Sequence, residues 1–169
     1  MNAVEEKVVA RLKDRYPQHV LGHAEYRNQL AVTVKSDGIV PLLRSLKEDP
    51  ELAFVRLVDL CGMDYLGRDE AERYAVAYHL HSFQHGLWIR IRALVPERPG
   101  EIDTLSGVWA CAEWLEREAF DMYGIRFRGH PDLRRILMPD YYTAFPLRKD
   151  YPLRGQGERD RFKVYDPAR

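Results

Sequence analysis

Residues 74–95 have the sequence YAVAYHLHSFQHGLWIRIRALV, which carries the clearest structural pattern in the chain. On either side of the central Gln-His-Gly, larger apolar side chains alternate with smaller or polar ones at a period of two. That period places successive side chains on opposite faces of a β-strand, and a short polar segment with glycine is typical of a turn. The stretch therefore predicts a β-hairpin with strands over residues 74–83 and 87–95.

Further helices and strands are predicted on both sides of this hairpin. The helices are expected over residues 4–16, 39–47 and 104–123, and the strands over residues 20–27, 29–35 and 52–60. Arg27-Asn28 suits a tight turn, and Gly124 suits the end of the last helix. The predicted class is α+β: a two-layer α/β domain with a mixed sheet of about five strands, a long C-terminal helix and an extended irregular basic tail. We expect one structural domain, with an α/β body over residues 1–124 and a docking tail over residues 125–169.

The composition is that of a folded protein without a membrane span. Hydrophobic residues make up 46% of the 169 residues and charged residues 31%, and no apolar run approaches the ~18 residues of a transmembrane helix. The polar N-terminus lacks the apolar core of a signal peptide, so the sequence favours a cytoplasmic protein. Cys61 and Cys111 are expected to be reduced and buried.

Charge is unevenly distributed although the net charge is zero. Residues 1–123 hold 15 Lys and Arg against 20 Asp and Glu, whereas residues 124–169 hold 11 against 6. We therefore expect the basic tail either to meet an acidic partner or to cover the acidic body.

The helix predicted over residues 104–123 has a carboxylate inside its apolar stripe. Glu116 recurs at helical spacing with the apolar residues of that stripe. An unpaired buried carboxylate costs several kcal/mol, so Glu116 needs a cationic or donor partner. His130, Arg134 and Arg135 are the candidates, because the chain reverses after the helix.

The opposite face of the same helix is expected to meet water. It carries Trp114, Arg117, Glu118 and Asp121, and Arg117 can pair with Asp121 four residues later. A large exposed aromatic flanked by charges is typical of a protein interface. Either the basic tail folds back over Trp114 or a partner protein covers it.

Five segments in this region form a recognisable pattern. They are Glu116-Arg117-Glu118, Asp121-Met122-Tyr123-Gly124, Gly129-His130-Pro131, Arg134-Arg135-Ile136-Leu137 and Pro146-Leu147-Arg148-Lys149-Asp150-Tyr151-Pro152-Leu153. In this order they resemble the signature of the C subunit of proton-translocating NADH:quinone oxidoreductase, respiratory complex I. The resemblance covers roughly residues 109–155.

The resemblance implies a place in a larger assembly. The C subunit of complex I is a peripheral-arm protein on the cytoplasmic side of the bacterial cell membrane. It binds the D subunit tightly, helps to support the quinone site that the D subunit forms, and lies near the B subunit and the iron–sulfur subunits. The resemblance implies no catalytic, cofactor or metal residue in this chain: FMN, iron–sulfur clusters, NADH and quinone belong to partner subunits. Its signature segments, with Trp114, are then expected to serve assembly.

The residues themselves give little support to independent chemistry. Two distant cysteines cannot bind an iron–sulfur cluster, and Gly155-Gln156-Gly157 lacks the third glycine and the strand–helix context of a dinucleotide site. His79, His81 and His85 offer too few ligands for zinc without a nearby acid or thiol, and fit a half-buried sheet face or a contact surface instead. The carboxylates of the long helix point to different faces, and Cys111 with His130 shows no sign of an exposed nucleophile pair.

The tail after Gly124 leaves two interpretations open. It has proline every six to eight residues, and a short helical turn is expected over residues 132–137. Its arginines and interleaved aromatic residues suit RNA or single-stranded DNA, although the overall pI near 7 and the lack of a nucleic-acid motif argue against this. The apolar anchors instead favour an arm that docks on a protein. These anchors are Leu133, Ile136, Leu137, Phe145, Leu147 and Leu153.

Overall fold

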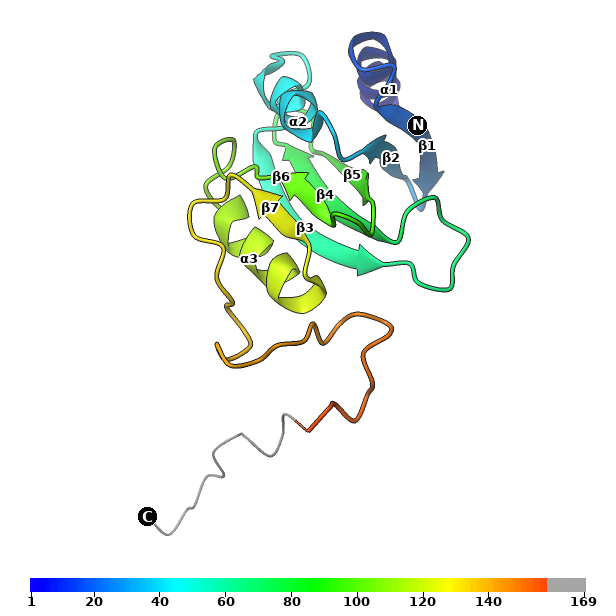
Figure 1. Ribbon diagram of the computed structural model, residues 1–169. Coiled ribbons are helices and arrows are strands. Elements are labelled where there is room, and N and C mark those ends of the chain that lie inside the picture. Colours follow the sequence, from blue (N-terminus) through cyan, green and yellow to red (C-terminus); the bar gives the residue numbers. More distant parts are fainter. Residues whose placement is uncertain (158–169) are drawn as a thin grey trace.

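Five strands form one mixed sheet in the computed structural model, which describes residues 1–157 (Figure 1). They are β1 (Val20–Tyr26), β2 (Gln29–Lys35), β3 (Arg56–Asp64), β4 (Tyr74–Ser82) and β5 (Leu87–Val95). Their order across the sheet is β1-β2-β5-β4-β3. β2 and β5 are parallel, and the other neighbours are antiparallel. The α+β class and the mixed five-stranded sheet are thus confirmed.

The hairpin of β4 and β5 has the predicted alternation. Tyr78 lies opposite Ile91, and both side chains are fully buried on the inner face of the sheet. The turn between β1 and β2 is also as predicted, because Arg27 and Asn28 both have positive φ angles, which a tight two-residue hairpin turn requires.

Three helices pack with the inner face of the sheet. They are α1 (Ala3–Arg15), α2 (Ile39–Glu48) and α3 (Ala112–Tyr123), and their buried residues join those of the inner face in one hydrophobic core. α3 lies against β3, where a side chain at Gly62 would come within 2.5 Å of the Tyr123 ring. Gly62 therefore sets the close approach of this helix to the sheet.

The last helix is shorter than predicted. It begins at Ala112, whereas the sequence predicted a long helix from Thr104. The intervening segment forms turns in which the N–H groups of Val108 and Trp109 both donate to the carbonyl of Leu105. Its apolar residues reach the core without a continuous helix, which explains the misleading helical spacing.

The third strand is displaced from its predicted position. β3 spans Arg56–Asp64, whereas the prediction was residues 52–60. Leu52 and Phe54 are buried, but they lie in a turn in which the N–H of Phe54 donates to the carbonyl of Leu46 at the end of α2. Burial rather than strand pairing explains this aliphatic run.

Two short strands were not predicted. β6 (Glu101–Asp103) and β7 (Arg126–Arg128) pair in parallel and lie near α3 (Figure 1). Each has only three residues, so neither has enough length to show a period in the sequence.

Other expectations for the chain were less successful. The helical turn predicted over residues 132–137 does not form. Cys61 and Cys111 are free thiols, but both residues are exposed rather than buried.

Within residues 1–157, none of the helices combines the length and the apolar character that crossing a membrane requires. The final part of the predicted tail, residues 158–169, lies outside the described residues.

Candidate protein-docking surface

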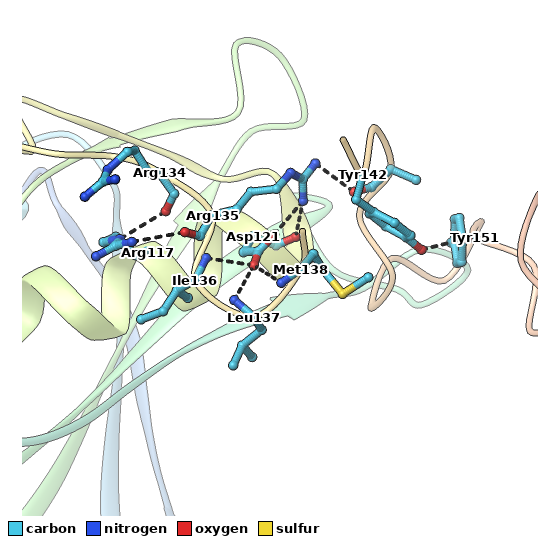
Figure 2. Close-up of polar contacts among 10 residues, drawn as sticks. Arg117, Asp121, Arg134, Arg135, Ile136, Leu137, Met138, Tyr142 and Tyr151 are labelled. Carbon is cyan, nitrogen blue, oxygen red and sulfur yellow. Dashed lines mark hydrogen bonds and ion pairs between the residues drawn. The ribbon is translucent and has the colours of Figure 1, made fainter. Parts of the chain in front are cut away.

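Asp121, near the end of α3, fixes the first part of the tail. Its fully buried carboxylate accepts hydrogen bonds through Oδ2 from the backbone N–H groups of Ile136 (3.0 Å), Leu137 (2.8 Å) and Met138 (2.8 Å) (Figure 2). Oδ1 accepts a hydrogen bond from Nη1 of Arg135 at 2.5 Å. Burial alone raises the pKa of Asp121, but the hydrogen bonds from Met138 and its neighbours outweigh this effect and hold the pKa below its usual value. The ionised carboxylate therefore organises this loop around one point.

Arg117, one turn earlier on α3, fixes the same loop from another direction. Its Nε and Nη2 donate to the carbonyl oxygens of Arg134 (3.1 Å) and Arg135 (3.0 Å) (Figure 2). Its guanidinium also lies 5.1 Å from the centre of the Trp114 ring. The predicted pairing of Arg117 with Asp121 on a solvent-facing surface is wrong. Both side chains are buried, because the tail covers this face of the helix.

Glu116 lies on the inner side of α3 and closes the turn before the helix. It is fully buried, as predicted, and accepts hydrogen bonds from the Thr104 hydroxyl (2.5 Å) and the Leu105 N–H (2.7 Å). Burial raises the pKa of Glu116, and these two hydrogen bonds only partly oppose the rise. Of the three predicted partners, the structure brings His130 near, with Nε2 4.0 Å from Oε2. The two arginines bond elsewhere, so that part of the prediction is wrong.

Hydrogen bonds at both ring nitrogens hold the His130 side chain in place. Nδ1 accepts from the N–H of Asp132 at 3.0 Å, and Nε2 donates to the carbonyl of Glu113 at 2.9 Å. Asp132 in turn forms an ion pair with Arg134 at 2.7 Å. This network joins the segment after Gly129 to the start of α3. Gly129 itself has a φ of 78°, a conformation that suits glycine.

The last signature segment, over residues 146–153, is also tied to the body. Arg148 Nε donates to the carbonyl of Tyr123 at 2.5 Å, and the guanidinium lies 5.3 Å from the centre of the Tyr74 ring and 4.4 Å from that of Phe145. Gly124 makes room for this contact. A side chain there would come within 2.6 Å of Phe145, and the φ of 76° is itself unfavourable for other residues.

Asp64 and Arg73 complete this attachment, although no sequence pattern had indicated either residue. Asp64 Oδ2 accepts from the backbone N–H of Lys149 at 2.8 Å, and Arg73 bridges Asp64 (3.3 Å) and Asp150 (2.8 Å). Burial raises the pKa of Asp64, but the hydrogen bonds from Arg73, Lys149 and Leu66 outweigh it and lower the pKa. A carboxylate at the end of a strand and an arginine in a loop have no distinctive spacing, so only the folded structure identifies the pair.

The signature residues therefore divide into an inner and an outer set. Glu116, Arg117 and Asp121 are buried, and the half-buried ones are Tyr123, Gly124, His130, Arg135, Pro146, Arg148 and Tyr151. The exposed ones are Trp114, Glu118, Gly129, Pro131, Arg134, Leu137, Leu147, Lys149, Asp150 and Pro152.

Several large apolar side chains remain exposed beside these attachments, and the four that are more than half exposed form one set. They are Trp114 (58% exposed), Leu137 (62%), Leu147 (52%) and Leu153 (97%), and we call them the outer apolar residues. The tail as far as residue 157 leaves Trp114 exposed, so the expectation that the tail covers this side chain is not met in the described chain. Exposed aromatic and aliphatic side chains held on a fixed backbone are typical of a protein-docking surface.

Across residues 1–157, no group of three or more His, Cys, Asp or Glu side chains is arranged to hold a metal ion. His79 and His81 lie on the outer face of β4, whereas Nε2 of His85 contacts the carbonyl of Glu51 at 2.9 Å.

Comparisons with known proteins agree with the motifs. The model of the family described as the 30 Kd subunit of respiratory-chain NADH dehydrogenase matches residues 32–157. The chain is 47% identical over 146 residues to the C subunit of NADH-quinone oxidoreductase from Roseiflexus sp. (strain RS-1), covering 86% of this chain and 83% of that protein. It is 43% identical over 161 residues to the C subunit from Geotalea uraniireducens (strain Rf4), covering 95% of each.

A solved structure gives the same result for the fold. The chain matches a trypsin-resistant fragment of Nqo5 with a TM-score of 0.65 and 29% identity, over 77% of this chain and 99% of the fragment. The region matched by the family model begins in β2 and contains all five signature segments, from Glu116 in α3 to Leu153.

Proposed function

The chain belongs to the family of the 30 kDa subunit of respiratory-chain NADH dehydrogenase and is a subunit of NADH-quinone oxidoreductase, and we propose that it is a non-catalytic scaffold of the peripheral arm. Its tail binds the D subunit, which forms part of the quinone site, and the chain lies beside the B subunit and the iron–sulfur subunits. NADH, FMN, the iron–sulfur clusters and quinone are held by these partners. The complex then keeps the chain, as a peripheral protein, on the cytoplasmic side of the bacterial membrane.

One observation carries the docking part of this proposal. Backbone groups of the tail are hydrogen-bonded to Asp121, Arg117 and Asp64 of the body, while the outer apolar residues are exposed. A surface that is fixed before binding loses less conformational entropy when a partner arrives than a disordered arm does. The tail is therefore a largely preformed docking surface rather than a free arm.

The same contacts weaken the alternative of nucleic-acid binding. Arg117 and Arg148 donate to backbone carbonyls, Arg135 pairs with Asp121, and Arg134 pairs with Asp132. Guanidinium groups engaged in this way are poorly placed to bind phosphates. A salt-dependent filter-binding assay with single-stranded RNA tests the alternative, and we expect no submicromolar binding.

The docking proposal is tested by making the outer apolar residues polar without disturbing the internal contacts. The combined variant Leu137→Ser, Leu147→Ser and Leu153→Ser removes three exposed side chains, so it should fold normally. We expect its co-purification with the D subunit to fall by about tenfold or more, because apolar anchors dominate such interfaces. The far-UV circular dichroism spectrum and the melting temperature should stay close to those of the wild type.

A matched control separates docking from a general effect of surface polarity. Leu21→Ser replaces a leucine that is 50% exposed in β1, at the edge of the sheet opposite to β3, and it should co-purify normally. If the triple variant folds and still binds the D subunit as the wild type does, the docking surface is assigned wrongly.

A further inference from the structure

The outer face of the five-stranded sheet has its own arrangement, separate from the tail. Three adjoining hollows lie on it, of about 400, 400 and 30 Å³, and Arg90 of β5 lines all three. The first is floored by small side chains from several strands, which leave room for a side chain from outside. These are Ala24, Ala31, Thr33, Cys61 and Ala77.

Arg90 is the unsatisfied group at the centre of these hollows. Its Nε is buried and has no hydrogen-bond partner among residues 1–157. The neighbouring Arg92 differs, because it donates to Glu70 (2.9 Å), Tyr65 (3.2 Å) and Thr33 (3.3 Å). A buried donor without an acceptor is unfavourable, and because Arg90 also lines the hollows, a molecule seated there can offer an acceptor to its guanidinium.

The surroundings of Arg90 favour a negatively charged partner. Arg27, in the turn after β1, and Arg56, at the start of β3, lie at the same end of the sheet, over the rings of Tyr26 (5.3 Å) and Phe83 (6.0 Å). Neither forms an ion pair with a carboxylate in residues 1–157. An acidic segment would therefore neutralise charges that the fold leaves unpaired.

Exposed aromatic side chains at the same end indicate a polypeptide partner. Tyr26, Phe83 and Trp88 are exposed there, and Trp88 packs against His81 with 4.8 Å between ring centres. Aromatic residues next to arginine are the side chains most enriched at the centres of protein interfaces.

We propose that the outer face of the sheet is a second docking surface, which takes an acidic segment of a neighbouring subunit and offers Arg90 to one of its carboxylates. The partner's carboxylate enters the hollow beside Ala31 and Ala77, and its flanking residues pack on Trp88 and Phe83. The inference rests on the chain's place in a multi-subunit complex but not on docking through the tail, so the two proposals fail separately.

A photoreactive residue in the assembled complex tests this inference. p-Benzoylphenylalanine replaces Phe83, an exposed aromatic, in the full chain, and the cross-linked peptide is identified by mass spectrometry. We expect one segment of another subunit that contains Asp or Glu. The same probe at Lys13, on the exposed side of α1, serves as the control and should not capture that segment.

The role of Arg90 is tested in the same cross-linking experiment. Arg90→Gln removes the charge and should lower the yield from position 83 by about tenfold, whereas Arg90→Lys should retain most of it, as a charge-dependent contact requires. A probe at Leu153 should still capture the D subunit from both variants. Absence of a cross-link from position 83, capture of a second copy of this chain, capture of a segment without acidic residues, or an unchanged yield with Arg90→Gln each overturns the proposal.

Discussion

Asp121→Ala tests how the tail is held on the body. The substitution removes a buried carboxylate that accepts three backbone hydrogen bonds and one from Arg135. Hydrogen bonds to a charged group contribute about 1.5–3 kcal/mol each, but the four are not additive, because the opened loop regains hydrogen bonds to water. Breaking a buried ion pair on one side costs about 3–5 kcal/mol, and we expect a loss in this range.

The loss is measured by denaturant unfolding of the full chain and by thermal melting. For a protein of this size it corresponds to a melting temperature lower by about 10 °C. Hydrogen exchange adds a local readout, since the N–H groups of Ile136, Leu137 and Met138 should lose protection first. Glu118→Ala, an exposed position on the same helix, is the control and should change stability by less than about 0.5 kcal/mol.

Dependence on pH provides a second check on the same carboxylate. Because the pKa of Asp121 is lowered by folding, its contribution is present above the unfolded pKa and is lost as the pH falls through the folded one. The stability difference between the wild type and Asp121→Asn should therefore be largest near neutral pH and shrink below about pH 4. A loss of less than about 1 kcal/mol for Asp121→Ala, with unchanged exchange in the loop, would refute this account of the tail.

Three other substitutions follow from the same structure. Glu116→Ala should cost about 3 kcal/mol in unfolding free energy, because it leaves the Leu105 N–H unsatisfied. Since folding raises the pKa of Glu116, the wild type should lose stability as the pH rises above about 4, and the stability of Glu116→Gln in urea titrations should then rise relative to that of the wild type. Gly124→Ala should lower stability by about 2 kcal/mol or more by thermal melting, because it combines a positive φ with a clash against Phe145. Arg148→Ala should leave the sheet intact but speed trypsin cleavage after Lys149, since it removes the contact that holds the last signature segment, residues 146–153.

The elements that the sequence predicted well are those with local signals. The alternation in β4 and β5 and the turn at Arg27-Asn28 depend only on neighbouring residues, and both are confirmed. The start of α3 and the position of β3 were predicted wrongly. Apolar residues such as Leu105 and Phe54 are buried although they lie in turns and not in a helix or strand. Tertiary contacts override local spacing at these places.

In the candidate site, too, local sequence signals were predictive and tertiary contacts were not. The motifs carried the family resemblance, and the burial of Glu116 followed from its place in an apolar stripe. Which cation meets which anion was not predictable, because Arg135 reaches Asp121 and Arg73 reaches Asp64 only after the chain has folded. The tail was expected either to cover the body or to dock on a partner, and the structure ties its backbone to the body while the outer apolar residues stay exposed.

Hydroxyl-radical footprinting of the isolated chain and of the assembled complex is the sharpest test of the docking surface. If the outer apolar residues form this surface, Trp114, Leu137 and Leu153 should be oxidised about tenfold more slowly in the complex, while the exposed Met1 changes little. Equal oxidation rates for these three side chains in the free chain and in the complex would contradict the assignment.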